Sequence, residues 1–195
     1  MSVFIEILCA CLVASGRLLI ALILLSVALG KMRAPAQFLR TVQEYRIGPE
    51  WLAIPLAVSI IGAEAILGMI LAGSILLPIP GFFVTSAAVA ASLLFSCFAF
   101  AVAVNLFRGR YHIDCGCNLG QKSHSISWTL VWRNILLAAI SVFVSPSIIA
   151  LDTVATITAC MGGIFLFLLY SFANIISHNR ILASRQKTSS AWNII

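Results

Sequence analysis

Two cysteines separated by a single residue, Cys115 and Cys117, are the side chains best suited to covalent chemistry in this sequence. A disulfide between them closes a tight, strained ring, and Gly116 relieves part of that strain. Strained and accessible disulfides are more oxidising than structural ones and exchange more readily. The pair is therefore suited to passing two electrons by thiol–disulfide exchange.

Charged neighbours affect the reactivity of these two thiols. Arg110 and His112 favour the thiolate form, whereas Asp114 opposes it, and Arg133 is expected to reach Asp114 from the next apolar run. Two other interpretations stay open. The thiols are inert if the cytosol keeps them reduced, or they bind a metal with His112 or His124. One intervening residue is unusual for structural zinc, but thiolates also suit copper(I).

Two charged residues, Arg17 and Glu64, lie inside long apolar runs. Charge at membrane depth is costly and tends to be paired or functional. Each residue lies deep in its run, so antiparallel neighbouring helices would bring the two side chains together near the middle of the membrane. They predict either a structural ion pair or the proton-linked or substrate-binding centre of a transporter.

The composition shows which kind of fold must position these residues. Hydrophobic residues make up 62% of the 195-residue chain and charged residues only 9%. Soluble domains carry about 25% charged residues, and disordered chains are poor in apolar ones, so both classes are excluded. The sequence has no glycine-rich phosphate loop and no Ser/His/Asp arrangement, and we predict neither a cofactor nor a nucleic-acid partner.

The apolar runs predict an all-α, polytopic bundle of transmembrane helices, with a four-helix core and a fifth span. About 20 residues cross the hydrocarbon core, and the predicted spans are 3–30, 52–77, 82–107, 128–150 and 154–177. They form one domain, 1–177, followed by a polar, loosely held tail, 178–195. Four spans remain possible if the last two runs form a broken hairpin. Pro146 predicts a kink or an early end in the fourth run.

Residues 35–46 connect the first two spans and have apolar side chains at helical spacing. They predict a short helix at the lipid–water interface, with an ordinary polar connection as the alternative. Ten of the twelve Lys and Arg residues lie between the first two spans (Lys31, Arg33, Arg40 and Arg46), in the 108–127 loop or in the tail. The positive-inside rule then places the N-terminus outside, and the Cys115–Cys117 loop and the C-terminus in the cytoplasm. The net charge of +6 thus indicates orientation.

Several of these features also occur together in one known family. In chain order they are Arg17, Gly30-Lys31, the aromatic-bearing connection from Phe38 to Tyr45, Glu64 with Gly68, Arg108-Gly109, Cys115-Gly116-Cys117, and Trp132-Arg133-Asn134. Together they resemble the MauE family of methylamine-utilisation proteins, relatives of the DoxX-like four-helix membrane proteins. The family often continues Cys-Gly-Cys-Phe-Gly, whereas Asn118-Leu119-Gly120 follows here, so the partner surface of the loop differs.

The resemblance implies a multi-pass protein of the bacterial inner membrane. Its implied role is maturation, processing or export of the methylamine dehydrogenase β (light) subunit, an exported protein with many disulfides. The implied partners are that subunit and a thioredoxin-like maturation protein, and the implied chemistry is thiol–disulfide exchange. We expect an accessory maturation factor, with a transporter centred on Arg17 and Glu64 or a metal-binding membrane protein as alternatives.

One conflict follows from these expectations. Disulfides form outside the cytoplasm, but the charge bias places the Cys115–Cys117 loop inside. Either the orientation is reversed, or the pair passes cytoplasmic electrons across the bilayer, or other residues carry out the exchange.

Overall fold

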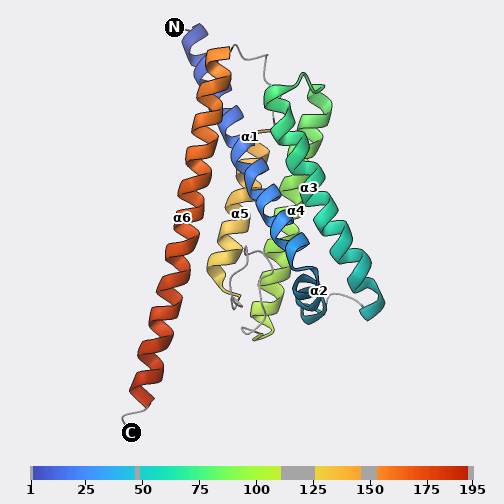
Figure 1. The fold of residues 1–195 in the computed structure, drawn as a ribbon, viewed down its shortest axis with the longest axis vertical. Coiled ribbons are helices and arrows are strands. Elements are labelled where there is room, and N and C mark those ends of the chain that lie inside the picture. Colours follow the sequence, from blue (N-terminus) through green and yellow to red (C-terminus); the bar gives the residue numbers. More distant parts are fainter. Residues whose placement is uncertain (1, 47–48, 111–125, 146–152, 193–195) are drawn as a thin grey trace.

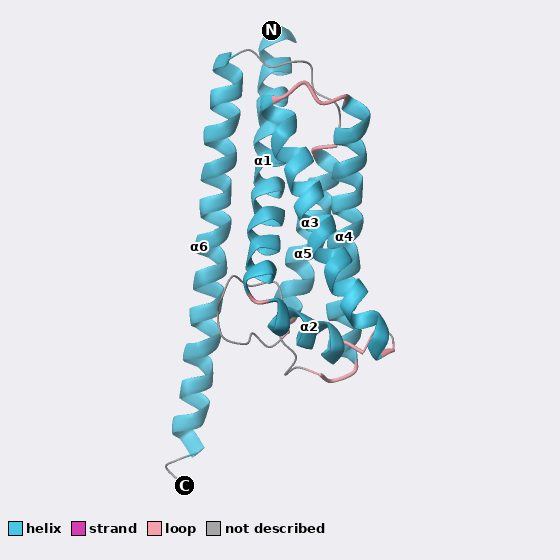
Figure 2. Cartoon of the chain, turned by 45° about the vertical axis from the view of Figure 1, so that its right-hand side comes forward, coloured by secondary structure: helices cyan, strands magenta, loops and turns pink. Residues whose placement is uncertain are grey.

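The computed structural model is a bundle of roughly aligned α-helices with the two chain ends at opposite ends of the molecule (Figure 1). It describes residues 2–46, 49–110, 126–145 and 153–192, with side chains from Ile5 to Ile176. The elements are α1 (Ser2–Arg33), α2 (Pro35–Glu44), the 3-10 turn η1 (Glu50–Leu52), α3 (Ala53–Leu76), α4 (Gly81–Phe107), α5 (Trp128–Phe143) and α6 (Thr153–Trp192). Every regular element in these ranges is helical, which confirms the predicted all-α bundle (Figure 2).

Four stretches of the described chain are long and apolar enough to cross a membrane, namely 5–33, 50–76, 81–107 and 153–176. They confirm a multi-pass membrane protein. Helix α5 has only 16 residues and is shorter than a full span, although it runs beside α4 through the bundle (Figures 1 and 2). Four of the five predicted runs therefore correspond to helices long enough to cross, and a fifth crossing, by α5, stays a prediction.

Two carbonyls just after the end of α5 accept hydrogen bonds from side chains of neighbouring helices. The helix stops at Phe143, shortly before Pro146, as the sequence predicts. Nε of Arg17 donates to the carbonyl oxygen of Val144 at 2.9 Å, and Oγ1 of Thr85 donates to that of Ser145 at 3.0 Å. Helix ends leave unpaired carbonyls that lipid cannot satisfy. Side chains of α1 and α4 therefore allow α5 to end within the bundle.

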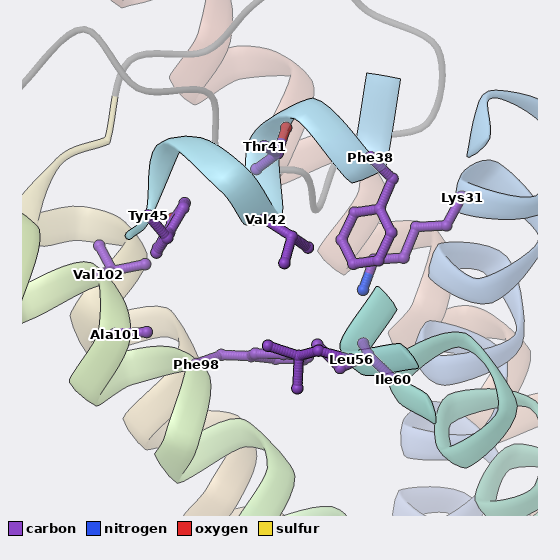
Figure 3. A pocket seen from close by; sticks show the side chains of 10 residues that line it. All are labelled: Lys31, Phe38, Thr41, Val42, Tyr45, Leu56, Ile60, Phe98, Ala101 and Val102. Carbon is purple, nitrogen blue, oxygen red and sulfur yellow. The ribbon is translucent and has the colours of Figure 1, made fainter. Parts of the chain in front are cut away.

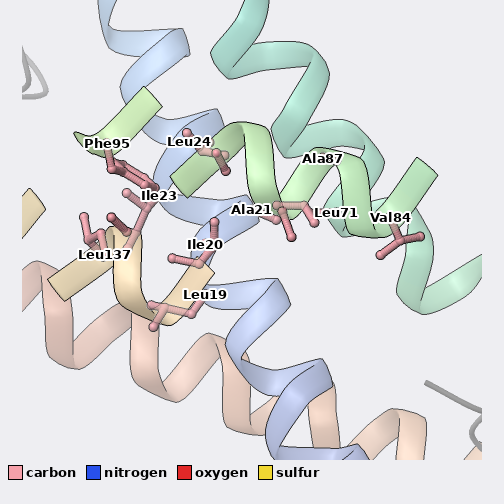
Figure 4. Close-up of a cluster of buried hydrophobic side chains, with 13 residues drawn as sticks. Leu19, Ile20, Ala21, Ile23, Leu24, Leu71, Val84, Ala87, Phe95 and Leu137 are labelled. Atoms are coloured by element: carbon pink, nitrogen blue, oxygen red, sulfur yellow. The ribbon is translucent and has the colours of Figure 1, made fainter. Parts of the chain in front are cut away.

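The core is built around α1, which contacts α2, α3, α5 and α6. One buried cluster joins α1, α3, α4 and α5, and its most enclosed members are Ile20, Ala21, Ile23, Leu24, Leu71, Ala88 and Ala91 (Figure 4). Lipid tails are as apolar as these side chains, so burial alone provides little driving force for association in a membrane. Close packing of small residues beside branched ones must supply it.

Gly68 lies where α3 approaches the backbone of α1. A Cβ atom there would come within 2.8 Å of Leu25 Cγ and 3.2 Å of the Ala21 carbonyl oxygen, whereas one at Gly62, on the same helix, would meet nothing within 4 Å. We expect Gly68→Ala to destabilise the bundle by about 1–3 kcal/mol because the helices must separate. Gly62→Ala, the matched control, is expected to be neutral or mildly stabilising. Thermal unfolding in detergent measures both, and equal melting temperatures would contradict the close approach.

Helix α6 lies on the outside of the bundle against α1, and the two helices run in the same direction (Figure 1). A Cβ atom on Gly162 would come within 2.7 Å of Ser15 Oγ, and one on Gly163 within 2.6 Å of Leu18 Cβ. The helix continues to Trp192, so the segment expected to be a loosely held tail is largely a helical extension of α6. No glycine or proline interrupts the chain between Gly163 and Trp192, which explains why the helix continues.

The helix predicted in the first connection is present as α2. Its apolar side chains Phe38 and Val42 are buried, as is Tyr45 at its C-cap, while Arg40 and Gln43 are exposed. Phe38 and Val42 pack against Ala53 and Ala57 of α3. The apolar face of α2 is therefore directed at the protein itself, and the helix covers one end of the bundle.

Candidate functional site

A buried ion pair joins α1 to α3 near the end of the bundle that α2 covers. Nζ of Lys31 lies 2.5 Å from Oε1 of Glu64, and the two side chains are only 4% and 1% exposed. Burying two charges has a large desolvation cost, which close pairing offsets only in part. Such a pair needs a structural or functional reason, and it is the most unusual polar feature among the described residues.

The predicted partnership of Arg17 with Glu64 is wrong. Arg17 is buried, as expected, but its guanidinium donates to the Val144 carbonyl, and Glu64 pairs with Lys31. Lys31 lies fourteen residues after Arg17 on the same helix, about 21 Å along its axis. The two intramembrane charges therefore serve different contacts, and they do not form one transport centre.

The sequence does not single out Lys31, because this lysine is one of several basic residues that follow the first apolar run. Its place at the end of a long apolar run indicated a charge outside the membrane. The sequence signal for its burial is its position directly after the apolar run 3–30. A lysine at the end of a span can extend its side chain back along the helix. Only the packing of α2 over this end of the bundle shows that Lys31 is buried.

Two aromatic rings complete the surroundings of the Lys31 ammonium. Nζ lies 4.5 Å from the ring centroid of Phe38 on α2 and 4.9 Å from that of Phe98 on α4 (Figure 3). Both distances are within the range of cation–π attraction, which is stronger when the cation is desolvated. Lys31 thus connects its own helix to α2, α3 and α4 through one ammonium group.

A small cavity adjoins Glu64 between α1, α3, α4, α5 and α6. It has a volume of about 20 Å³ and is lined by Glu64, Arg133, Asn134, Tyr170 and apolar side chains. That volume holds about one water molecule, and polar groups surround it. Nη1 of Arg133 donates to Oδ1 of Asn174 on α6 at 3.3 Å. Polar groups of α3, α5 and α6 therefore converge beside the ion pair.

The structure describes the frame of the cysteine loop. Helix α4 ends in a Schellman motif, in which the N–H of Gly109 donates to the Leu106 carbonyl and that of Arg110 to the Asn105 carbonyl. Gly109 has φ +71°, the left-handed conformation that this motif requires and glycine adopts without strain. The motif fixes the direction in which the chain enters the loop.

The far end of the loop returns beside its start. The rings of Phe107 and Trp128 meet edge to face with centroids 5.2 Å apart. Ile126 is buried with Leu106 of α4 and Tyr45 of α2. The two loop ends are therefore held together beside α2, at the same end of the bundle as the Lys31–Glu64 pair.

The predicted reactive residues themselves, Cys115, Cys117, His112, Asp114 and His124, lie outside the described residues. The redox pair, the metal alternative and the expected contact between Arg133 and Asp114 therefore stay predictions. Arg110 is described and half-buried at the start of the loop. Arg133 is half-buried too, and it donates a hydrogen bond to Asn174 of α6.

The basic connections gather at one end of the molecule. The first connection, the two ends of the cysteine loop and the C-terminus all lie at the end opposite the N-terminus (Figures 1 and 2). Arg33, Arg40, Arg46 and Arg108 are exposed there. The charge asymmetry read from the sequence is therefore an asymmetry between the two ends of the bundle.

Comparison with known proteins identifies the family that this chain resembles. The family model described as "Methylamine utilisation protein MauE" matches residues 5–146. Methylamine utilization protein MauE of Paracoccus denitrificans is 29% identical over 89% of this chain and 91% of its own length. The protein of that name from Methylophilus methylotrophus is 36% identical over 82% of both chains, and that from Methylorubrum extorquens 36% identical over 63% and 62%. No solved structure matches. The chain belongs to the MauE family of methylamine utilisation proteins.

Proposed function

We propose that this protein acts in methylamine utilisation as a membrane maturation factor for the β subunit of methylamine dehydrogenase. The observation that carries the proposal is membership of the MauE family in a chain that also has the Cys115-Gly116-Cys117 motif. In this proposal the motif exchanges disulfides with a thioredoxin-like partner, which acts on the exported subunit. Each exchange breaks one S–S bond and forms another, while two thiol protons move to the released sulfurs.

The frame of the loop supports this chemistry. A reactive pair must be accessible to a partner protein and must be held in a constant place. The Schellman motif at Gly109 and the ring contact between Phe107 and Trp128 hold both ends of the loop on rigid helices. The loop thus has fixed ends at the polar end of the bundle, where a soluble partner has access.

The orientation belongs to the same proposal. With the basic end in the cytoplasm, the N-terminus lies outside the inner membrane, and the cysteine pair accepts electrons from cytoplasmic thiols. These electrons must then cross the bilayer to reach an exported client. With the basic end outside, the pair meets the client's maturation partner directly.

Thiol labelling in intact cells decides between these orientations. A membrane-impermeant maleimide is expected to leave Cys115 and Cys117 unlabelled until the cells are permeabilised. The other four cysteines, Cys9, Cys11, Cys97 and Cys160, are replaced by serine in this experiment, so that only Cys115 and Cys117 can be labelled. Labelling without permeabilisation would show that the loop faces the outside and that the orientation is the reverse of the one expected. A gain in labelling after reductant would show that the pair forms a disulfide in the cell, and thiols labelled equally with and without reductant would contradict redox cycling.

A further inference from the structure

We propose that the protein binds one phospholipid with an ethanolamine headgroup in a site formed by α2, η1 and the first turns of α3. The site consists of a wide groove and a narrow apolar slot that continues from it beneath α2. Val42 and Leu56 line both the groove and the slot, so the two spaces adjoin. This inference is independent of the chemistry of the cysteine loop.

The groove has the size and the side chains of a headgroup site. Its volume is about 690 Å³, which is within the range of small-molecule sites. Its polar lining residues are Gln43, Arg46, Glu50 and Ser59, and the remainder are apolar or proline. It thus offers one basic, one acidic and two neutral polar side chains on a mainly apolar surface.

The slot fits an alkyl chain. It has a volume of about 60 Å³ and extends between α2, α3 and α4 over Phe38, Val42, Ile60 and Phe98 (Figure 3). A cavity that admits benzene measures about 150 Å³, whereas a single water needs only about 10–15 Å³. The volume of the slot lies between these two values, which suits a segment of methylene chain. Lys31 lies at one wall, but its ammonium is engaged by Glu64.

The position of the site matches the depth of a lipid headgroup. The groove lies where the apolar stretch of α3 begins, next to Trp51, whose side chain is 74% exposed. Tryptophan is enriched at the level of lipid headgroups. A lipid entering from the bilayer would place its headgroup in the groove and its chain along the slot.

The charges in the groove select the headgroup. The guanidinium of Arg46 pairs with a phosphate, and the carboxylate of Glu50 pairs with a primary ammonium, which donates hydrogen bonds that a quaternary ammonium lacks. Phosphatidylethanolamine has both groups. Phosphatidylglycerol has a phosphate but no cation for Glu50, and phosphatidylcholine has no N–H group to donate.

Lipid in the slot would also stabilise the base of the cysteine loop. Tyr45 and Val102 line the slot, and both pack with Ile126 at the far end of that loop. Filling the slot therefore supports the cluster that holds the loop ends together, and bound phosphatidylethanolamine is expected to raise the melting temperature.

Native mass spectrometry of the full-length protein in detergent tests the site with dioleoyl phosphatidylethanolamine, phosphatidylglycerol and phosphatidylcholine. Phosphatidylethanolamine is expected to bind tightest. Arg46→Gln and Glu50→Gln should each weaken it about tenfold, because each removes a charge-assisted contact. Arg40→Gln is the matched control, since Arg40 is exposed on the outer face of α2 and does not line the groove.

A second pair of variants tests the slot. Ala101→Phe places a ring in it and is expected to abolish binding, whereas Ser96→Phe adds the same ring on the exposed face of α4 and leaves binding unchanged. The Cys115→Ser/Cys117→Ser variant should bind lipid like the wild type, which separates this test from that of the proposed function. Equal binding of the three lipids, tighter binding of phosphatidylglycerol, or equal effects of Arg40→Gln and Arg46→Gln would overturn the proposal.

Discussion

Serine at either Cys115 or Cys117 is expected to abolish accumulation of mature methylamine dehydrogenase β subunit in cells grown on methylamine. Each substitution removes one of the two sulfurs that a disulfide needs, so a single loss ends exchange altogether. The resulting defect should equal that of deleting the whole protein. Immunoblotting of the exported subunit and growth on methylamine as carbon source measure the effect, while growth on a carbon source that bypasses the dehydrogenase should be normal.

Cys97→Ser is the matched control for this experiment. Cys97 is a free and exposed cysteine on α4, so the same chemical change there should leave the subunit at wild-type abundance. The Cys115 and Cys117 variants must also be present in the membrane at the wild-type level, which excludes a folding defect. Normal amounts of mature subunit in both variants would contradict thiol–disulfide exchange, and the client would then have to be matured by another part of the molecule.

Lys31→Met is expected to destabilise the bundle more than any other single change at the buried polar residues. It removes the cation that lies 2.5 Å from Glu64 Oε1, in a site where the Glu64 side chain is 1% exposed. Breaking a buried pair by removing one partner costs about 3–5 kcal/mol, because the other charge stays in a poorly solvated place. Thermal unfolding of the purified protein in detergent measures the loss.

The double variant Lys31→Met/Glu64→Gln decides why Lys31→Met is destabilising. Removing both charges should recover most of the lost stability, because neither charge of the pair then stays buried. Arg33→Met, two residues further along α1 and exposed, should have almost no effect. If the double variant is as unstable as Lys31→Met alone, the contacts of the ammonium with the Phe38 and Phe98 rings contribute more than its pairing with Glu64.

The double variant also separates stability from function. If it folds and restores stability but the β subunit still fails to mature, the pair has a role beyond holding the helices together. If the subunit matures normally, Lys31 and Glu64 are structural. The position of the pair beside the base of the cysteine loop makes both outcomes informative about how the loop is supported.

Much of the fold follows from the sequence, because a membrane imposes strict rules on it. Backbone groups in lipid must be paired within helices, and a span needs about 20 apolar residues, so the runs at 52–77 and 82–107 predict α3 and α4 to within a residue or two. The spacing of Phe38, Val42 and Tyr45 predicts α2 for the same kind of local reason. Pro146 indicates the early end of α5 because proline restricts the residue before it.

The sequence alone determined the membrane class, the helix positions, the charge asymmetry and the Cys-Gly-Cys motif, since each depends on neighbouring residues in the chain. Only the tertiary structure decided the partners of the buried charges. Arg17 and Glu64 looked like one pair from their depths, but helix rotation and register direct Arg17 to the end of α5 and Glu64 to Lys31. Rotation and register arise from close contacts such as that of Gly68 with Ala21 and Leu25. These contacts join residues far apart in sequence, and hydropathy does not encode them.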